Sequence, residues 1–195
     1  MRTILALLSL LCLVPQPAKG RQITAGSDED KMFQTLSAET DSEVKLQHLM
    51  DYEKQFPQSK ALTNIYLMAI DIYREKEDQD HIIEYGEKVL NLDQNNVTAL
   101  MILSRNYAIQ GRDIDRAIEL AGRAVDVIGR MKTQPRPTSY TEARWKDYLQ
   151  VTEAAAQSIL EYTKMVKSHE EAVAQSPSPS KETEAPEKDE APDNH

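Results

Sequence analysis

The sequence predicts an all-α fold, and three observations predict it. Only Pro57, Pro135 and Pro137 of the nine prolines lie between residues 21 and 175, so this stretch has almost no residue that interrupts a helix. Its apolar residues recur three and four positions apart, the spacing that places them on one helix face. Residues 63–96 also resemble residues 97–130 at a constant offset of 34. The 195-residue chain, 40% apolar, is long enough for one helical domain with appendages.

The first 20 residues have the pattern of an export signal. Arg2 supplies a positive charge, residues 4–14 form an apolar run, and Ala18 and Gly20 place small residues before a cleavage point. The run has about half the roughly 20 residues that a membrane-spanning helix needs. We therefore predict a signal peptide at residues 1–20, no integral membrane span, and export to a periplasmic or extracellular space. A short buried helix or a membrane anchor is the alternative.

Charge and cysteine content restrict the partners and the chemistry. Removal of Arg2 and Lys19 changes the net charge of the chain from −9 to −11. An acidic chain of this kind argues against nucleic acid as a partner, because phosphate contacts need clustered Lys and Arg. The only cysteine, Cys12, lies in the predicted signal, so the mature chain has no disulfide, thiolate metal site or thiol nucleophile.

Between a linker at residues 21–27 and the chain's end, the spacing predicts a helical repeat domain at residues 28–175. The expected helices cover residues 28–38, 40–56, 61–76, 80–92, 97–110, 113–129 and 139–167. Capping boxes at Thr40–Glu43 and Ser139–Glu142 open the second and the last of these helices. A further box at Ser168–Glu171 predicts a short, truncated helix after residue 167.

The last long helix is expected to turn an apolar stripe inward. Its residues are Trp145, Tyr148, Leu149, Thr152, Ala156, Ile159, Leu160, Thr163 and Val166. The spacing of three and four is that of a helix face that packs on its neighbours.

The two 34-residue blocks share large and small residues at fixed places. The second block carries Leu100, Leu103, Ser104, Tyr107, Gly111, Ala117, Ala121 and Ala124, and the first carries Tyr66, Ala69, Ile70, Tyr73, Ile82, Gly86, Val89 and Leu90. This pattern resembles the tetratricopeptide repeat (TPR) family over roughly residues 30–174, with partial repeats on either side of the two clear ones. The resemblance implies a right-handed α-solenoid of antiparallel helix pairs, in which small residues let helices approach closely.

The resemblance also implies where a ligand would bind. In TPR-like arrays the first helix of each pair lines a concave surface, and its outward residues contact a protein or peptide. In this chain those positions are Asn64, Leu67, Asp71, Arg74, Thr98, Met101, Arg105 and Ala108. The carboxylate-clamp variant of the family needs more Lys and Arg than this face offers.

The two blocks differ sharply in charge. Residues 63–96 carry −5, whereas residues 97–130 carry +1, with Arg105, Arg112, Arg116, Arg123 and Arg130 as their only basic residues. Guanidinium groups pair well with carboxylates. Two interpretations follow: Arg105 or Arg116 pairs with acids of the adjacent repeat, or the arginines line a ligand groove.

The sequence contains no pattern typical of catalysis. His48, His81, His169 and His195 have no metal-ligand spacing, and no Gly-rich phosphate loop is present. Carboxylates at residues 75–87 fit a solvated helix face. We therefore expect no enzyme activity, no metal and no cofactor. Asn96-Val97-Thr98 is a glycosylation sequon, relevant only in a eukaryotic secretory pathway.

The composition of residues 176–195, with four prolines and a charge of −4, predicts a disordered, acidic, Pro-rich tail.

The leading hypothesis for the function is an exported TPR-like scaffold that presents a shallow groove to a protein or peptide, without catalysis. The alternative is a self-associating structural or envelope-assembly component. In that case the incomplete C-terminal repeat leaves the stripe at 145–166 poorly covered and mediates homo-oligomerisation.

Overall fold

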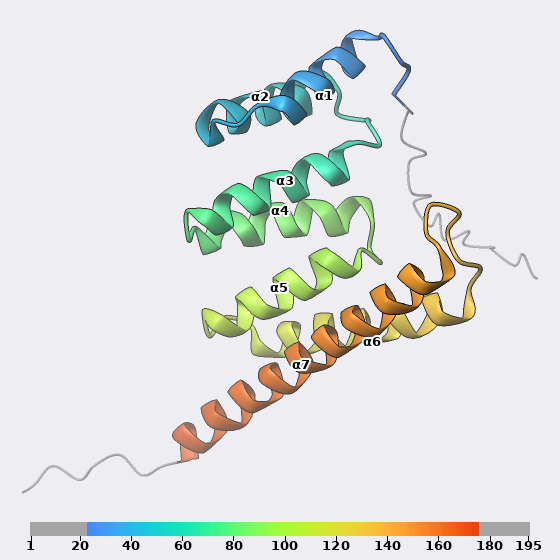
Figure 1. The fold of residues 1–195 in the computed structure, drawn as a ribbon. Coiled ribbons are helices and arrows are strands. Elements are labelled where there is room, and N and C mark those ends of the chain that lie inside the picture. Colours follow the sequence, from blue (N-terminus) through green and yellow to red (C-terminus); the bar gives the residue numbers. More distant parts are fainter. Residues whose placement is uncertain (1–22, 176–195) are drawn as a thin grey trace, which may run out of the picture.

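The computed structural model describes residues 23–175, which form seven α-helices and no strand (Figure 1). The helices are α1 Asp28–Ala38, α2 Ser42–Gln55, α3 Leu62–Glu75, α4 Gln79–Leu92, α5 Val97–Ile109, α6 Ile114–Thr133 and α7 Glu142–Gln175. The predicted signal at residues 1–20 and the predicted tail at residues 176–195 lie outside the described residues. The all-α prediction is confirmed for the described part of the chain.

Several helices begin at a residue whose side chain accepts backbone hydrogen bonds. Asp41 caps α2 by accepting from the amides of Glu43 and Val44, both at 3.0 Å. The predicted cap at Thr40 is therefore wrong, because the carboxylate one residue later reaches two amides that would otherwise lack partners. The predicted start at Ser139 is also wrong. Helix α7 begins at Glu142, where the hydroxyl of Thr141 accepts from the Arg144 amide at 3.3 Å.

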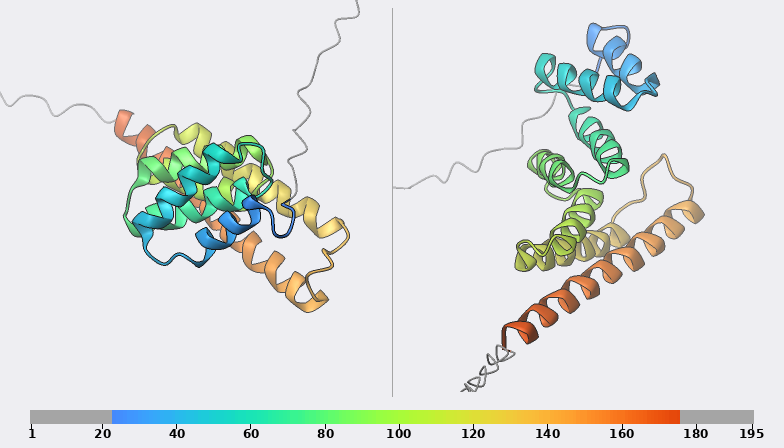
Figure 2. Two further views of the ribbon diagram at one scale, coloured as in Figure 1. Left: turned by 90° about the horizontal axis from the view of Figure 1, so that it is seen from above. Right: turned by 90° about the vertical axis from the view of Figure 1, so that its left-hand side faces the viewer.

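Each helix packs against the next one along the chain, and the core lies between them (Figures 1 and 2). Gly86 of α4 faces Leu103 of α5 so closely that a Cβ atom at Gly86 would lie 2.7 Å from Leu103 Cδ2. On α6, the small residues Ala117, Ala121 and Ala124 are fully buried. The prediction that small residues permit close helix approach is confirmed at these positions.

Helices α5 and α6 are joined by a buried polar contact as well as by apolar packing. The hydroxyl of Ser104 donates to the carbonyl oxygen of Ala117 at 2.7 Å. Because Ser104 is completely buried, this bond satisfies a hydroxyl that would otherwise be desolvated without a partner.

The last helix, α7, has 34 residues and lies across α5 and α6 (Figure 2). It continues through Ser168 to Gln175, so the predicted end near residue 167 and the separate truncated helix are wrong. The Ser168 hydroxyl donates to the Lys164 carbonyl at 3.1 Å, a bond that a helical serine makes within its own helix.

The predicted inward stripe of α7 is confirmed, but the expectation that it is poorly covered is wrong. Leu149, Ala156 and Thr163 are buried, and the other stripe residues are half-buried against the neighbouring helices. The packing of α7 on α5 and α6 covers this face. Among the described residues, no helix is long and apolar enough to cross a membrane.

Candidate functional site

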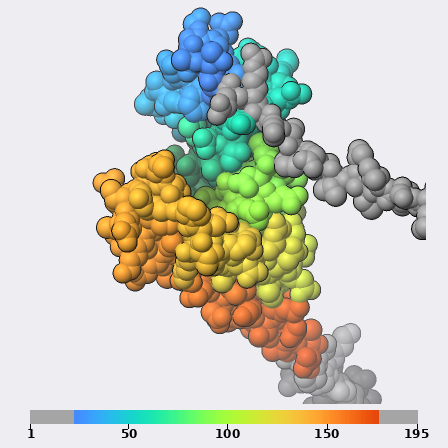
Figure 3. Space-filling view, turned by 90° about the vertical axis from the view of Figure 1, so that its right-hand side faces the viewer, coloured from blue at the N-terminus to red at the C-terminus, as the bar shows by residue number. Residues whose placement is uncertain are grey.

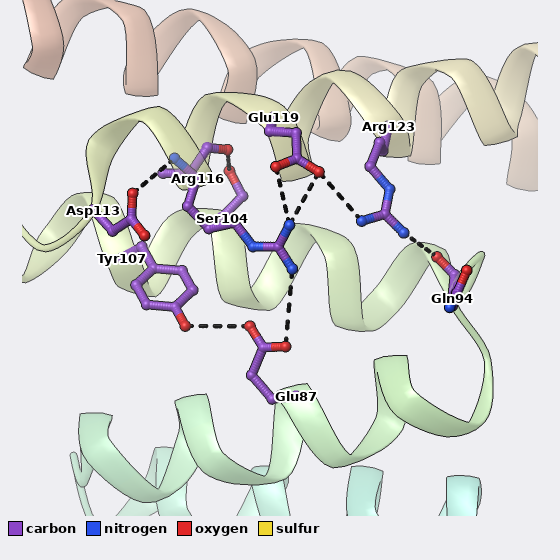
Figure 4. A network of polar contacts seen from close by, with 9 residues as sticks. Glu87, Gln94, Ser104, Tyr107, Asp113, Arg116, Glu119 and Arg123 are labelled. Carbon is purple, nitrogen blue, oxygen red and sulfur yellow. Dashed lines mark hydrogen bonds and ion pairs between the residues drawn. The ribbon is translucent and has the colours of Figure 1, made fainter.

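Four of the five arginines at residues 97–130 bond to groups of neighbouring segments. Arg112 Nη1 lies 2.7 Å from Asp80 Oδ1, at the start of α4. Arg130 Nη2 lies 3.4 Å from Asn95 Oδ1, in the turn between α4 and α5. Arg116 and Arg123 belong to the network in Figure 4. Arg112 and Arg116 reach acids of the adjacent repeat, so the first interpretation is confirmed for Arg116, whereas Arg123 and Arg130 contact uncharged oxygens at the end of that repeat.

The Figure 4 network connects α4, α5 and α6. The Arg116 guanidinium bonds to Glu119 at 3.0 Å and lies 4.0 Å from Glu87. The Tyr107 hydroxyl donates to Glu87 at 3.2 Å, and burial, followed by the charge of Glu87, raises the pKa of Tyr107. Arg123 donates to the Gln94 carbonyl at 2.7 Å. Each charge in this network has a partner, so its role is to hold the helices together.

Arg105 differs from the other four arginines. It is exposed on α5, and its guanidinium makes no hydrogen bond or ion pair with any residue from 23 to 175. Arg105 and Ile109 line two hollows, one on either side of α5. We call this pair the Arg105 ridge. The first interpretation is therefore wrong for Arg105, and the ligand groove stays a prediction there.

The first hollow, about 200 Å³, lies between α3 and α5 and is also lined by the first turn of α4. Apart from the ridge, its lining residues are Ile70, Arg74, Gln79, Ile82, Ile102 and Asn106. The side-chain oxygen Oε1 of Gln79 is buried and accepts no hydrogen bond from the described residues. A buried acceptor without a donor costs about 1–3 kcal/mol. The hollow thus combines an apolar floor with the guanidinium of Arg105, while the Gln79 oxygen is buried beneath its surface.

The second hollow, about 430 Å³, lies between α5 and α7. Ser158, Ile159 and Tyr162 of α7 complete its lining beside the Arg105 ridge. Tyr162 is 37% exposed and Ile109 50% exposed, so the walls of the hollow offer apolar surface to solvent.

The structure brings some of the predicted site residues together. Arg74 and Arg105 line the same hollow, but the guanidinium of Arg74 is neutralised by Asp71, with Nη2 and Oδ1 at 2.9 Å. Asn64 and Thr98 are exposed in the first turns of α3 and α5.

Leu67 and Met101 are half-buried beside the core, and Ala108 is only 4% exposed. The outward placement of Ala108 is therefore wrong. A helix of 3.6 residues per turn aligns Ile109, rather than Ala108, with Thr98 and Arg105.

The sequence-based prediction missed three groups of residues. Ile109 could have been found by strict helical counting from Arg105. Gln79 gives no local signal, because its unpaired oxygen depends on how α4 packs. Ser158, Ile159 and Tyr162 could not be found, since their place beside Arg105 depends on the path of α7 across α5.

Comparison with protein-family models and with curated proteins finds no match for this sequence.

Within residues 23–175, no group of three or more His, Cys, Asp or Glu side chains could hold a metal ion. Figure 3 shows the connection from α6 to α7 and the first turns of α7, in orange, standing out beside the surface of the stack. The site is described by its own geometry: an unpaired guanidinium, a buried free acceptor and exposed apolar walls.

Proposed function

We propose that the protein is an exported, TPR-like scaffold, arranged as an α-solenoid, that binds a protein or peptide segment on the α3–α5 face. The observation that carries the proposal is Arg105, an exposed cation without a partner among the described residues, between two apolar hollows. A carboxylate of the partner would pair with Arg105, and its apolar side chains would enter the hollows. Binding requires no covalent step, cofactor or metal.

Affinity capture from the native compartment tests this function. The tagged wild-type chain is compared with Arg105→Glu, which reverses the unpaired charge, and with Arg130→Glu, which makes the same charge change on α6. We expect Arg105→Glu to lose the captured protein by tenfold or more and Arg130→Glu to retain it. Equal capture by all three chains, or no specific capture at all, would contradict the proposal.

Export is a separate part of the proposal, supported by the leader sequence alone. N-terminal sequencing of the protein that cells accumulate should begin at Arg21. A chain that retains Met1 would contradict cleavage after Gly20.

A further inference from the structure

Helix α7 has a second apolar face in addition to the one that packs on α5 and α6. Val151, Tyr162, Met165 and Val173 are 69%, 37%, 61% and 59% exposed. At 100° per residue, these four positions fall within about 80° of one another around the helix. Buried Ala156 points about 140° away from Val151 by the same count. We call the exposed face the α7 seam.

The seam lies on the last helix of the stack (Figure 1), where polar residues are expected. Repeat arrays usually end in an element with a polar outer face, because an uncovered apolar face favours association. Here the seam carries apolar side chains from Val151 to Val173. The described chain provides no further helix to cover them.

The seam has the residue spacing of a helix–helix contact. Val151, Ala155, Ser158, Tyr162, Met165 and His169 follow one another at alternating intervals of four and three. This is the heptad pattern by which two helices interlock their side chains. The partner that this pattern fits is a helix.

The order of large and small residues along the seam allows two copies of the seam to fit together when the helices run antiparallel. When two copies of α7 run antiparallel with their midpoint at residue 160, Ser158 faces Tyr162 and Ala155 faces Met165. The large side chains of Tyr162 and Met165 then each meet a small one, and Val151 faces His169 at the two ends. A parallel pair would place Tyr162 against Tyr162 and would leave gaps at Ala155 and Ser158.

The charge near the midpoint of this arrangement is already balanced. The two copies of Glu161 approach each other there, but Glu161 Oε1 lies 3.6 Å from Lys164 Nζ of its own helix. Each copy therefore brings a cation beside its carboxylate, which weakens the repulsion.

From this self-complementarity we infer that the protein forms a homodimer through antiparallel contact of two α7 seams. The seam shares Ser158 and Tyr162 with the second hollow but no residue with the α3–α5 hollow, and the proposal does not rest on the peptide-binding function. The facing parts of the two seams, residues 151–169, are about 27 Å long and bury on the order of 1,000 Å² from both copies, the low end for a specific interface. The dimer is therefore reversible and concentration-dependent. Because α7 is already ordered against α5 and α6, little helix-forming entropy opposes association.

Sedimentation of the full chain across micromolar to millimolar concentrations tests the dimer. We expect a monomer–dimer equilibrium, at least a tenfold weaker dimer for Met165→Glu, and an unchanged dimer for the control Val44→Glu. Val44 is 43% exposed on α2, away from the seam. Met165→Glu should keep the circular dichroism spectrum of the parent, since Met165 is mostly exposed. A monomer at every concentration, or a dimer unaffected by Met165→Glu, would overturn the proposal.

Cysteine pairing tests the antiparallel direction in a Cys12→Ser background. The chains Val151→Cys and His169→Cys should form a mixed disulfide when combined, because these positions face each other. Neither chain should link to itself, since equal positions lie about 27 Å apart along the seam. Self-linkage of Val151→Cys would indicate a parallel pair and overturn the proposal, as would capture of another protein's helix by the seam of a monomeric chain.

The two proposals fail in different experiments. Arg105→Glu should lose peptide capture and retain the dimer, whereas Met165→Glu should lose the dimer and retain capture. Capture retained by Arg105→Glu would contradict only the peptide-binding proposal, and a dimer retained by Met165→Glu would contradict only the dimer proposal.

Discussion

At the scale of single residues, Tyr52 shows how a buried polar group joins separate segments. Its hydroxyl donates to Glu29 Oε1 at 3.1 Å and lies 3.0 Å from the hydroxyl of Ser59, while its ring packs against Phe33 and Phe56. Tyr52 thus connects α1, α2 and the turn before α3. Burial raises its pKa to about 12, and the neighbouring carboxylate of Glu29 also acts in that direction.

Replacement of Tyr52 by Phe should lower the free energy of unfolding by about 1 kcal/mol, because Glu29 loses a hydrogen bond in a buried place. Urea unfolding at neutral pH measures this change. The control Tyr140→Phe removes a hydroxyl from an exposed ring and should have no effect. Equal stability of Tyr52→Phe and the parent chain would contradict this role.

The same tyrosine predicts a loss of stability at high pH. Since its pKa is about 12 in the folded protein and about 10 when unfolded, its neutral form stabilises the fold fully below pH 10. This stabilisation is lost as the pH rises from 10 to 12. Tyr85 shares the shift, so Tyr52→Phe should reduce the pH dependence without abolishing it. Urea titrations at pH 9 and pH 11.5 compare the two chains.

At the scale of helices, the approach of α4 to α5 depends on the absence of a side chain at Gly86. An alanine Cβ there would lie within 2.8 Å of two Leu103 side-chain carbons, so the helices or Leu103 would have to move. We expect Gly86→Ala to cost about 1–3 kcal/mol of stability. The control Gly122→Ala on α6 meets no atom within 4 Å and should be neutral or stabilising, as alanine favours helix. A stabilised Gly86→Ala chain in urea unfolding would contradict the close approach.

Helix α7 divides into a packed part and an exposed part. Ile159, Leu160 and Thr163 lie on the packed side, whereas residues 168–175 are exposed. A chain that ends at Ser168 should keep the melting temperature of the parent, whereas a chain that ends at Gln157 should lose about 2–4 kcal/mol of stability, because apolar area is uncovered. Thermal unfolding measures both. Equal loss in the two chains would show that residues 169–175 also stabilise the fold.

The sequence predicted the helices better than their ends and their surroundings. The predicted helices at residues 61–76 and 97–110 contain α3 and α5, because a periodic pattern of apolar residues is a strong signal for a helix. The α2 cap was misplaced since Thr40 and Asp41 are both good capping residues. Ser168 suggested a cap for the same reason, but the continuous helix allows its hydroxyl to bond to Lys164 instead. Arg105 could not be separated from Arg116 by sequence, because pairing depends on the position of the facing helix.

At the scale of the whole molecule, stability comes from packing and polar contacts within a cysteine-free body. Residues 23–175 contain no cysteine, since Cys12 is the only one in the chain. A millimolar thiol reductant should therefore leave the melting temperature unchanged. Differential scanning calorimetry with and without reductant checks this, and a fall of several degrees would contradict it.

The length of α7 has a mechanical consequence. A helix of 34 residues is about 51 Å long, and Lys167, which pairs with Asp115 of α6, is the last described ion-pair contact along it. The eight residues after Lys167 extend the helix by about 12 Å as a stiff rod. These last turns therefore act as a spacer that ends at Gln175. Any group joined to the chain at Gln175 would be held away from the Arg105 ridge, which would stay accessible.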